Sequence, residues 1–127
     1  MSKEWYDDLT EKVIAAAYEV SNHLGCGYLE RVYHNALLCE LSAMGLSVKS
    51  EVEARVVYKG QEVGLYYIDI LVEDRVILEL KSVNFLVNAH KAQLINYLHA
   101  TGLNLGLLFN FGSPHVQVQR VVHNYPY

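Results

Sequence analysis

Two acids and a lysine interrupt the most apolar stretches of the sequence. Asp69 stands inside the apolar run 66–72, and Glu79 with Lys81 interrupts the run 76–81. Such runs are typical of buried strands, where a carboxylate persists only when it is paired or bound to a metal. Carboxylates are ligands that Mg²⁺ prefers, and a nearby ammonium can orient a water molecule or a phosphate oxygen. The spacing therefore predicts a hard-cation site.

The same residues also have a purely structural explanation. Asp69 could stand at an unpaired strand end, and Glu79 with Lys81 could form a solvated pair on an exposed face. The pattern of one acid followed by ExK is short, so by itself it favours this explanation. The apolar surroundings of both acids are what favour the metal site.

Two helices are expected before these residues. Apolar residues recur at helical spacing over 8–23, where Asp8 and Glu11 are placed like a capping box. A second periodic set over 29–44 ends at Gly45, which is expected to lie just past the helix C-terminus. These two segments predict a pair of helices at the start of the fold.

Five strands and one more helix complete the expected order. Period-two alternation predicts a strand with one wet face over 48–58, and turns at Lys59-Gly60 and Glu73-Asp74 lead into strands at 62–72 and 75–82. These three strands should form an antiparallel meander. A helix at 90–101, a strand buried on both faces at 103–111 and a more polar edge strand at 116–122 follow.

Strand alternation predicts which face of the sheet each candidate site residue occupies. Asp69 should share a face with Tyr67 and Leu71, while Ile68, Ile70 and Val72 share the other. Glu79 and Lys81 should likewise lie opposite Val76, Leu78 and Leu80. A short turn then lets Asp69 and Glu79 lie on adjacent strands.

The order ααβββαββ predicts an α/β chain of the α+β mixed-sheet kind, with residues 1–127 as one domain. A doubly wound nucleotide-binding fold would alternate strands and helices from the start, and neither GxGxxG nor GxxxxGK[ST] occurs. The 127 residues, 52% of them hydrophobic, suffice for one core and exclude a disordered chain.

Charge and cysteine content limit the possible functions. The 10 Lys and Arg against 14 Asp and Glu give a net charge of -4, which argues against a general nucleic-acid coat protein. Cys26 and Cys39 have no disulfide or CxxC pattern and are expected to be reduced. With no secretory signal and no apolar run near the roughly 20 residues that span a bilayer, we expect a cytoplasmic protein without a membrane partner.

Four motifs in order resemble the PD-(D/E)XK nuclease superfamily, and specifically its small GxxExxY proteins. The segment from Gly27 to Tyr33 matches the motif that names the group, and Asp69 with Glu79-Leu80-Lys81 matches the metal-site motif. Segments 90–98 and 106–112 extend the resemblance, which covers about 9 to 123.

The resemblance implies a restriction-endonuclease-like core and a metal site. Mg²⁺ or Mn²⁺ would be held by Asp69, Glu79 and the backbone carbonyl of Leu80, and Lys81 would activate or position the attacking water. Glu30 matches an acid of the first core helix that binds metal directly or through water in related nucleases. Its alternative explanation is a first-turn glutamate favoured by the helix dipole.

Further site residues come from the same resemblance. Gln93 and Tyr97 share a helix face and match a QxxxY element that lies beside the metal and touches substrate or orders the lysine, although a core tyrosine with a polar neighbour would give the same spacing.

Arg31, Tyr33 and Tyr67 are expected to contact substrate. The sequence departs from many relatives at Tyr66-Tyr67, where an arginine is common, so one phosphate contact is missing. Of the histidines, only His34, one turn after Glu30, is placed to reach the site.

Two functions from different classes follow. The first is metal-dependent hydrolysis of phosphodiester bonds in nucleic acid, DNA rather than RNA, by in-line attack that expels the 3′ oxygen. The second is a catalytically inactive nuclease-fold module that binds nucleic acid or a protein partner, which the low basic content favours. A third hypothesis is that the chain is a subunit of an assembly, such as a homodimer, which the exposed edge at 116–122 would permit.

Overall fold

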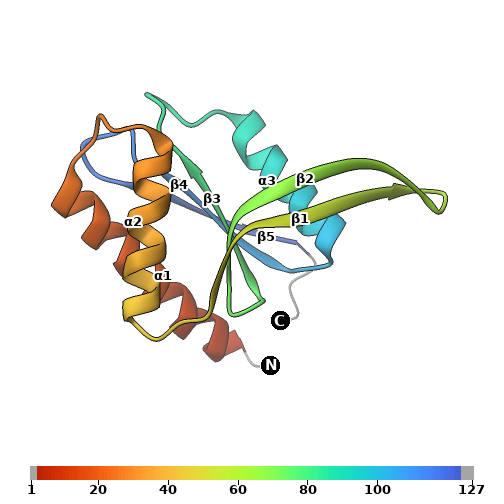
Figure 1. Cartoon of the computed structure of the whole chain (residues 1–127), viewed down its shortest axis with the longest axis horizontal. Helices are drawn as coiled ribbons and strands as arrows, with labels where there is room; N and C mark the ends of the chain where they lie inside the picture. Colours follow the sequence, from red (N-terminus) through yellow and green to blue (C-terminus); the bar gives the residue numbers. More distant parts are fainter. Residues whose placement is uncertain (1–2, 124–127) are drawn as a thin grey trace.

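A five-stranded mixed sheet separates two helical layers (Figure 1). The computed structural model describes residues 3–123, with side chains from residue 8 onward. Helices α1 (Lys3–Leu24) and α2 (Glu30–Ala43) cover one face, and α3 (Asn88–Thr101) covers the other. The strands are β1 (Val48–Tyr58), β2 (Gln61–Val72), β3 (Val76–Lys81), β4 (Leu105–Asn110) and β5 (Gln117–Val122). The predicted fold class and the order ααβββαββ are confirmed.

The sheet has the order β1-β2-β3-β4-β5. The first three strands form the expected antiparallel meander, β4 runs parallel to β3, and β5 is antiparallel to β4. Parallel neighbours need a long crossover, and α3 supplies it between β3 and β4. Every residue of β4 is buried, as expected for a strand covered by helices on both faces.

The start of α1 differs from the prediction. The helix already includes Lys3, so Asp8 lies within it and the proposed capping box with Glu11 is wrong. The residues between Lys3 and Asp8 include no glycine or proline that would end a helix. A short capping pattern therefore did not mark the true beginning.

Strand β2 does not keep the predicted faces. Ile70 and Val72 pack with α1 and α2, whereas Ile68 packs with α3, so the shared face predicted for these three residues is wrong. Leu71 packs on the α3 side, while Tyr67 is 54% exposed. The side chains thus change sides of the sheet around Asp69.

The cause is an irregularity between β1 and β2. Ser50 pairs with Ile70 and Val52 pairs with Ile68, but Glu51 between them has a φ of 55° and no partner in the ladder. The register is the same on both sides of Glu51, so no residue is inserted, but a left-handed residue breaks the regular alternation of a strand. In this register Asp69 lies opposite Glu51, at the position where the side chains change face.

Beyond this point the β1–β2 hairpin leaves the rest of the sheet. Strand β3 pairs with β2 only through Ile70, Leu71 and Val72. The remaining part of the hairpin extends past the sheet, and α3 lies along one side of it (Figure 1). Within residues 3–123, none of the helices combines the length and apolar character that crossing a membrane would require.

Candidate functional site

Asp69 and Glu79 join β2 to β3 where their ladder ends. After the pair Ile70–Leu78, the backbone N–H of Asp69 donates to Glu79 Oε1 at 3.3 Å. On the other strand, the backbone N–H of Leu80 donates to Asp69 Oδ2 at 2.8 Å. Side-chain carboxylates therefore accept the backbone N–H groups of Asp69 and Leu80 just beyond the last pair of the ladder. The predicted neighbourhood of the two acids is present.

Burial makes the charge on these two acids unfavourable. Glu79 is only 4% exposed, and this burial, followed by the negative charge of Asp69, raises the pKa of Glu79 well above its usual range. Burial likewise raises the pKa of Asp69, although the hydrogen bond from Leu80 opposes the shift. Strongly perturbed acids in one place are a mark of functional sites.

The N-terminus of α2 brings a third acid toward Asp69. Glu30 is the first residue of α2, and it lines a pocket of about 250 Å³ together with Arg31, His34 and Asp69. Although Glu30 lies at the surface, shielding from water and then the charge of Asp69 raise its pKa. His34 reaches this pocket as expected, and its Nε2 lies 2.8 Å from Ser50 Oγ.

Lys81 is the last residue of β3 and stands half-buried beside the three acids. Its positive charge lowers the pKa of Glu30, Asp69 and Glu79, against the larger effect of burial. Within residues 8–123, Lys81 forms no ion pair with any of these carboxylates. Its ammonium group is therefore near all three acids but is not in an ion pair with any one of them.

The candidate metal ligands at this site are carboxylates, and only some of them lie close enough together to share an ion. In the part of the chain that the structure describes, no group of three or more His, Cys, Asp or Glu side chains stands ready to hold a metal ion. Asp69 and Glu79 form the close pair, and Glu30 faces Asp69 across the pocket. Oxygen donors of this kind suit a hard divalent cation, whose positive charge would stabilise the ionised carboxylates that burial disfavours.

A buried asparagine that the sequence analysis did not assign to the site fixes the segment after Lys81. Asn110 is fully buried; its Oδ1 accepts from the N–H of Val83 and Gly112, and its Nδ2 donates to the carbonyl of Val83. A Cβ at Gly112 would lie 2.2 Å from the carbonyl oxygen of Val83, so only glycine permits this approach. A polar residue inside the apolar run 103–111 was the available signal.

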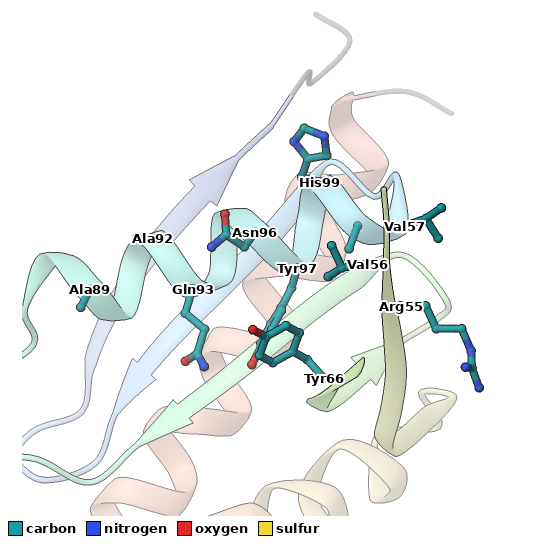
Figure 2. A pocket seen from close by; sticks show the side chains of 11 residues that line it. Arg55, Val56, Val57, Tyr66, Ala89, Ala92, Gln93, Asn96, Tyr97 and His99 are labelled. Carbon is teal, nitrogen blue, oxygen red and sulfur yellow. The ribbon is translucent and has the colours of Figure 1, made fainter. Parts of the chain in front are cut away.

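Helix α3 brings Gln93 and Tyr97 toward the acids from the opposite face of the sheet. Burial and the charges of Glu79 and Asp69 raise the pKa of Tyr97 to about 12, which indicates that its hydroxyl is near both. Gln93 extends from the same side of α3, and the Tyr97 ring lies beside that of Tyr66, with centroids 5.7 Å apart (Figure 2). Tyr97 therefore lies near the carboxylates, and Gln93 lies one turn away on the same side of α3.

The three predicted substrate contacts have different surroundings. Tyr33 is fully buried, stacks on Phe111 and donates to the carbonyl of Gly25 at 2.6 Å, so direct contact with substrate is wrong for this residue. Its place in the apolar stripe of its helix was the signal for a core role. Arg31 lines the pocket and bonds Glu51 at 2.7 Å. Contact between substrate and the exposed Tyr67 stays a prediction.

Comparisons with known proteins identify the fold family. A solved structure titled "Crystal structure of SSO0001" has a TM-score of 0.59 and 18% sequence identity, which supports likeness of fold alone. The match covers 76% of this chain and only 50% of that one. A search among curated proteins found no match. The family model described as the PD-(D/E)XK nuclease superfamily matches residues 7–121, and the chain therefore belongs to this superfamily.

Proposed function

We propose that this protein is a divalent-metal-dependent nuclease that hydrolyses phosphodiester bonds, with DNA as its substrate. The observation that carries the proposal is the Asp69–Glu79 pair, whose side chains hold β2 and β3 together beside Lys81, which forms no ion pair within residues 8–123. Burial raises the pKa of both acids, so their charged forms destabilise the metal-free fold, and the charge of a bound cation would offset this effect.

The metal ligands that we propose are Asp69, Glu79 and the carbonyl of Leu80, with Glu30 acting directly or through water. Mg²⁺ and Mn²⁺ fit because every donor is an oxygen. When bound, such an ion supplies a more acidic water and compensation for charge that builds on the phosphate. The smaller GxxExxY group is the branch of the superfamily to which we assign the chain.

Other residues would orient the reactants. Lys81 carries the free positive charge near the acids and would position the attacking water or a phosphate oxygen. Gln93 and Tyr97 border the site from α3 and would order Lys81 or contact substrate. Arg31 and Tyr67 are proposed as outer substrate contacts. The oxygen of the attacking water would form a bond to phosphorus as the bond from phosphorus to the 3′ oxygen breaks, and the proton lost by the water would pass through solvent while the departing 3′ oxygen takes up a proton.

Cleavage of a panel of labelled nucleic acids tests this function. Single-stranded, duplex and branched DNA, with matched RNA, would be incubated with wild-type protein in Mg²⁺, Mn²⁺ or EDTA. We expect product from at least one DNA substrate in either metal and none in EDTA. Product that forms equally in EDTA would contradict the proposal.

The rival function is an inactive module that binds nucleic acid or a protein. The observation that favours it is the pairing of cations with acids, since Arg31, Lys49 and Arg55 are all engaged in ion pairs. Calorimetry with Mg²⁺ and with oligonucleotides separates the two readings: binding without any turnover across the panel would favour the module. Size measurement in solution would test the predicted homodimer.

A further inference from the structure

A groove of about 730 Å³ lies between the β1–β2 hairpin and α3 (Figure 2). The hairpin contributes Val56 and Tyr66, and the helix contributes Gln93, Asn96 and Tyr97. Small side chains from α3, such as Ala92, leave room between the two walls. The volume falls within the range of small-molecule sites and exceeds what one side chain would fill.

The walls of the groove offer flat aromatic surface beside amide groups. The rings of Tyr66 and Tyr97 lie 5.7 Å apart at 47°, so they are tilted rather than stacked on each other. Tyr66 is 49% exposed and keeps much of its ring available. The amides of Gln93 and Asn96 can both donate and accept hydrogen bonds. This combination suits a planar heterocycle with polar edges.

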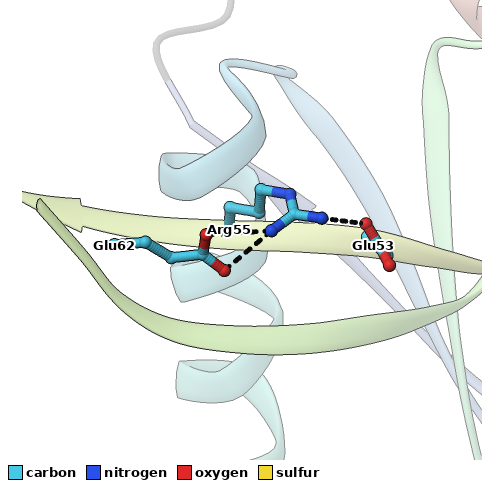
Figure 3. Close-up of polar contacts among 3 residues, drawn as sticks. All are labelled: Glu53, Arg55 and Glu62. Carbon is cyan, nitrogen blue, oxygen red and sulfur yellow. Dashed lines mark hydrogen bonds and ion pairs between the residues drawn. The ribbon is translucent and has the colours of Figure 1, made fainter.

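The groove offers little to a phosphate group. Among residues 8–123, its lining includes one arginine, Arg55, and no lysine. The guanidinium of Arg55 donates to both carboxylate oxygens of Glu62, at 2.8 and 2.9 Å, and also to Glu53 (Figure 3). Its positive charge is thus already compensated by two acids, and its side chain points away from α3 (Figure 2).

The groove lies next to the carboxylate site, because Tyr66 in its wall is three residues before Asp69 on β2. Tyr97 also lines the groove, and its hydroxyl lies near enough to Glu79 and Asp69 for their charges to raise its pKa. Gln93, one turn earlier, extends from the same side of the helix (Figure 2). A nucleotide whose phosphate reached the carboxylates would therefore have its base beside the two tyrosines.

We propose that this groove binds an unpaired nucleobase of the DNA strand whose phosphate is cleaved at Asp69 and Glu79. The inference rests on the proposed function and adds a preference for unpaired DNA. A base inside a duplex presents neither a free face nor free pairing edges, so it would have to leave the stack first. Stacking on aromatic rings also supplies affinity that this acidic protein cannot obtain from phosphate contacts.

Binding to strands with and without bases tests the groove separately from cleavage. Fluorescence anisotropy in Ca²⁺ would compare a labelled oligodeoxythymidine with a strand of equal length and charge whose residues are abasic. Wild type should bind the thymidine strand about fivefold to about 100-fold more tightly, the range expected for one or two stacked bases. Tyr66→Ala and Asn96→Ala should reduce this ratio toward one, and Tyr66→Phe should largely keep it.

Tyr58→Ala is the matched control, because Tyr58 is an exposed tyrosine of the same hairpin that does not line the groove. It should leave the ratio unchanged. Equal wild-type affinity for the two strands, or an unchanged ratio in both Tyr66→Ala and Asn96→Ala, would overturn the inference even if the protein cleaves DNA. Base-dependent binding without cleavage would instead support the groove and contradict the proposed function.

Discussion

The backbone N–H of Asp69 donates to the side chain of Glu79, a residue of the neighbouring strand, where the ladder between their strands stops. The carboxylate of Asp69 in turn accepts from Leu80. The two acids therefore stabilise the pairing of β2 and β3 at the point where we propose that they bind a metal ion. Replacement by an amide preserves the hydrogen-bond acceptor and removes the charge, which separates these two roles experimentally.

Glu79→Gln should stabilise the metal-free protein at high pH. The pKa of Glu79 is higher in the folded than in the unfolded chain, so the unfolded chain loses its proton first and wild-type stability falls as pH rises between the two values. The variant has no such loss. We expect a gain on the order of 1–3 kcal/mol at pH 9 that vanishes near pH 4.

Urea unfolding in EDTA at the two pH values measures this effect. The control is Glu40→Gln, since Glu40 is on α2 and is not part of the acid cluster. A stability difference between wild type and Glu79→Gln that stays constant with pH would show that Glu79 carries no unfavourable charge in the fold.

Asn110→Ala should destabilise the fold through the segment that follows Lys81. The substitution leaves the N–H and carbonyl of Val83 without their side-chain partner, and we expect a loss of about 2–4 kcal/mol. The exposed Asn35→Ala on α2 should change stability by less than about 0.5 kcal/mol. Thermal unfolding compares them, and equal melting temperatures would mean that Asn110 does not fix this segment.

Glu51→Gln should strengthen binding to single-stranded DNA at low salt. Glu51 engages Arg31 at the pocket that Glu30 and Asp69 line, so removal of its charge frees the guanidinium for phosphate. We expect an increase of about two- to fivefold, which salt should suppress. Asp74→Asn frees Lys49, which does not line that pocket, and serves as the control. If both variants gain equally, only net charge is responsible.

Much of the fold, and the proximity of Asp69 to Glu79, could be predicted because the sequence patterns that indicate them are local or strongly periodic. The alternating strands, the apolar run of β4 and the glycines at 45 and 102 fix element order, and buried acids stand out against apolar neighbours. The change of face at Asp69 was not predictable, since its cause is Glu51 on another strand in a conformation that glutamate rarely adopts. Tyr33 was misassigned because a motif residue can be essential for packing alone.

The rate of DNA cleavage in Mg²⁺ by three variants tests the central claim most directly. Asp69→Asn keeps an oxygen that can accept from Leu80, and Lys81→Ala removes the unpaired ammonium, so both should fold. The account predicts that each loses on the order of 10²-fold or more in rate, while Asp74→Asn cleaves like wild type. Cleavage by Asp69→Asn and Lys81→Ala at the wild-type rate would contradict it.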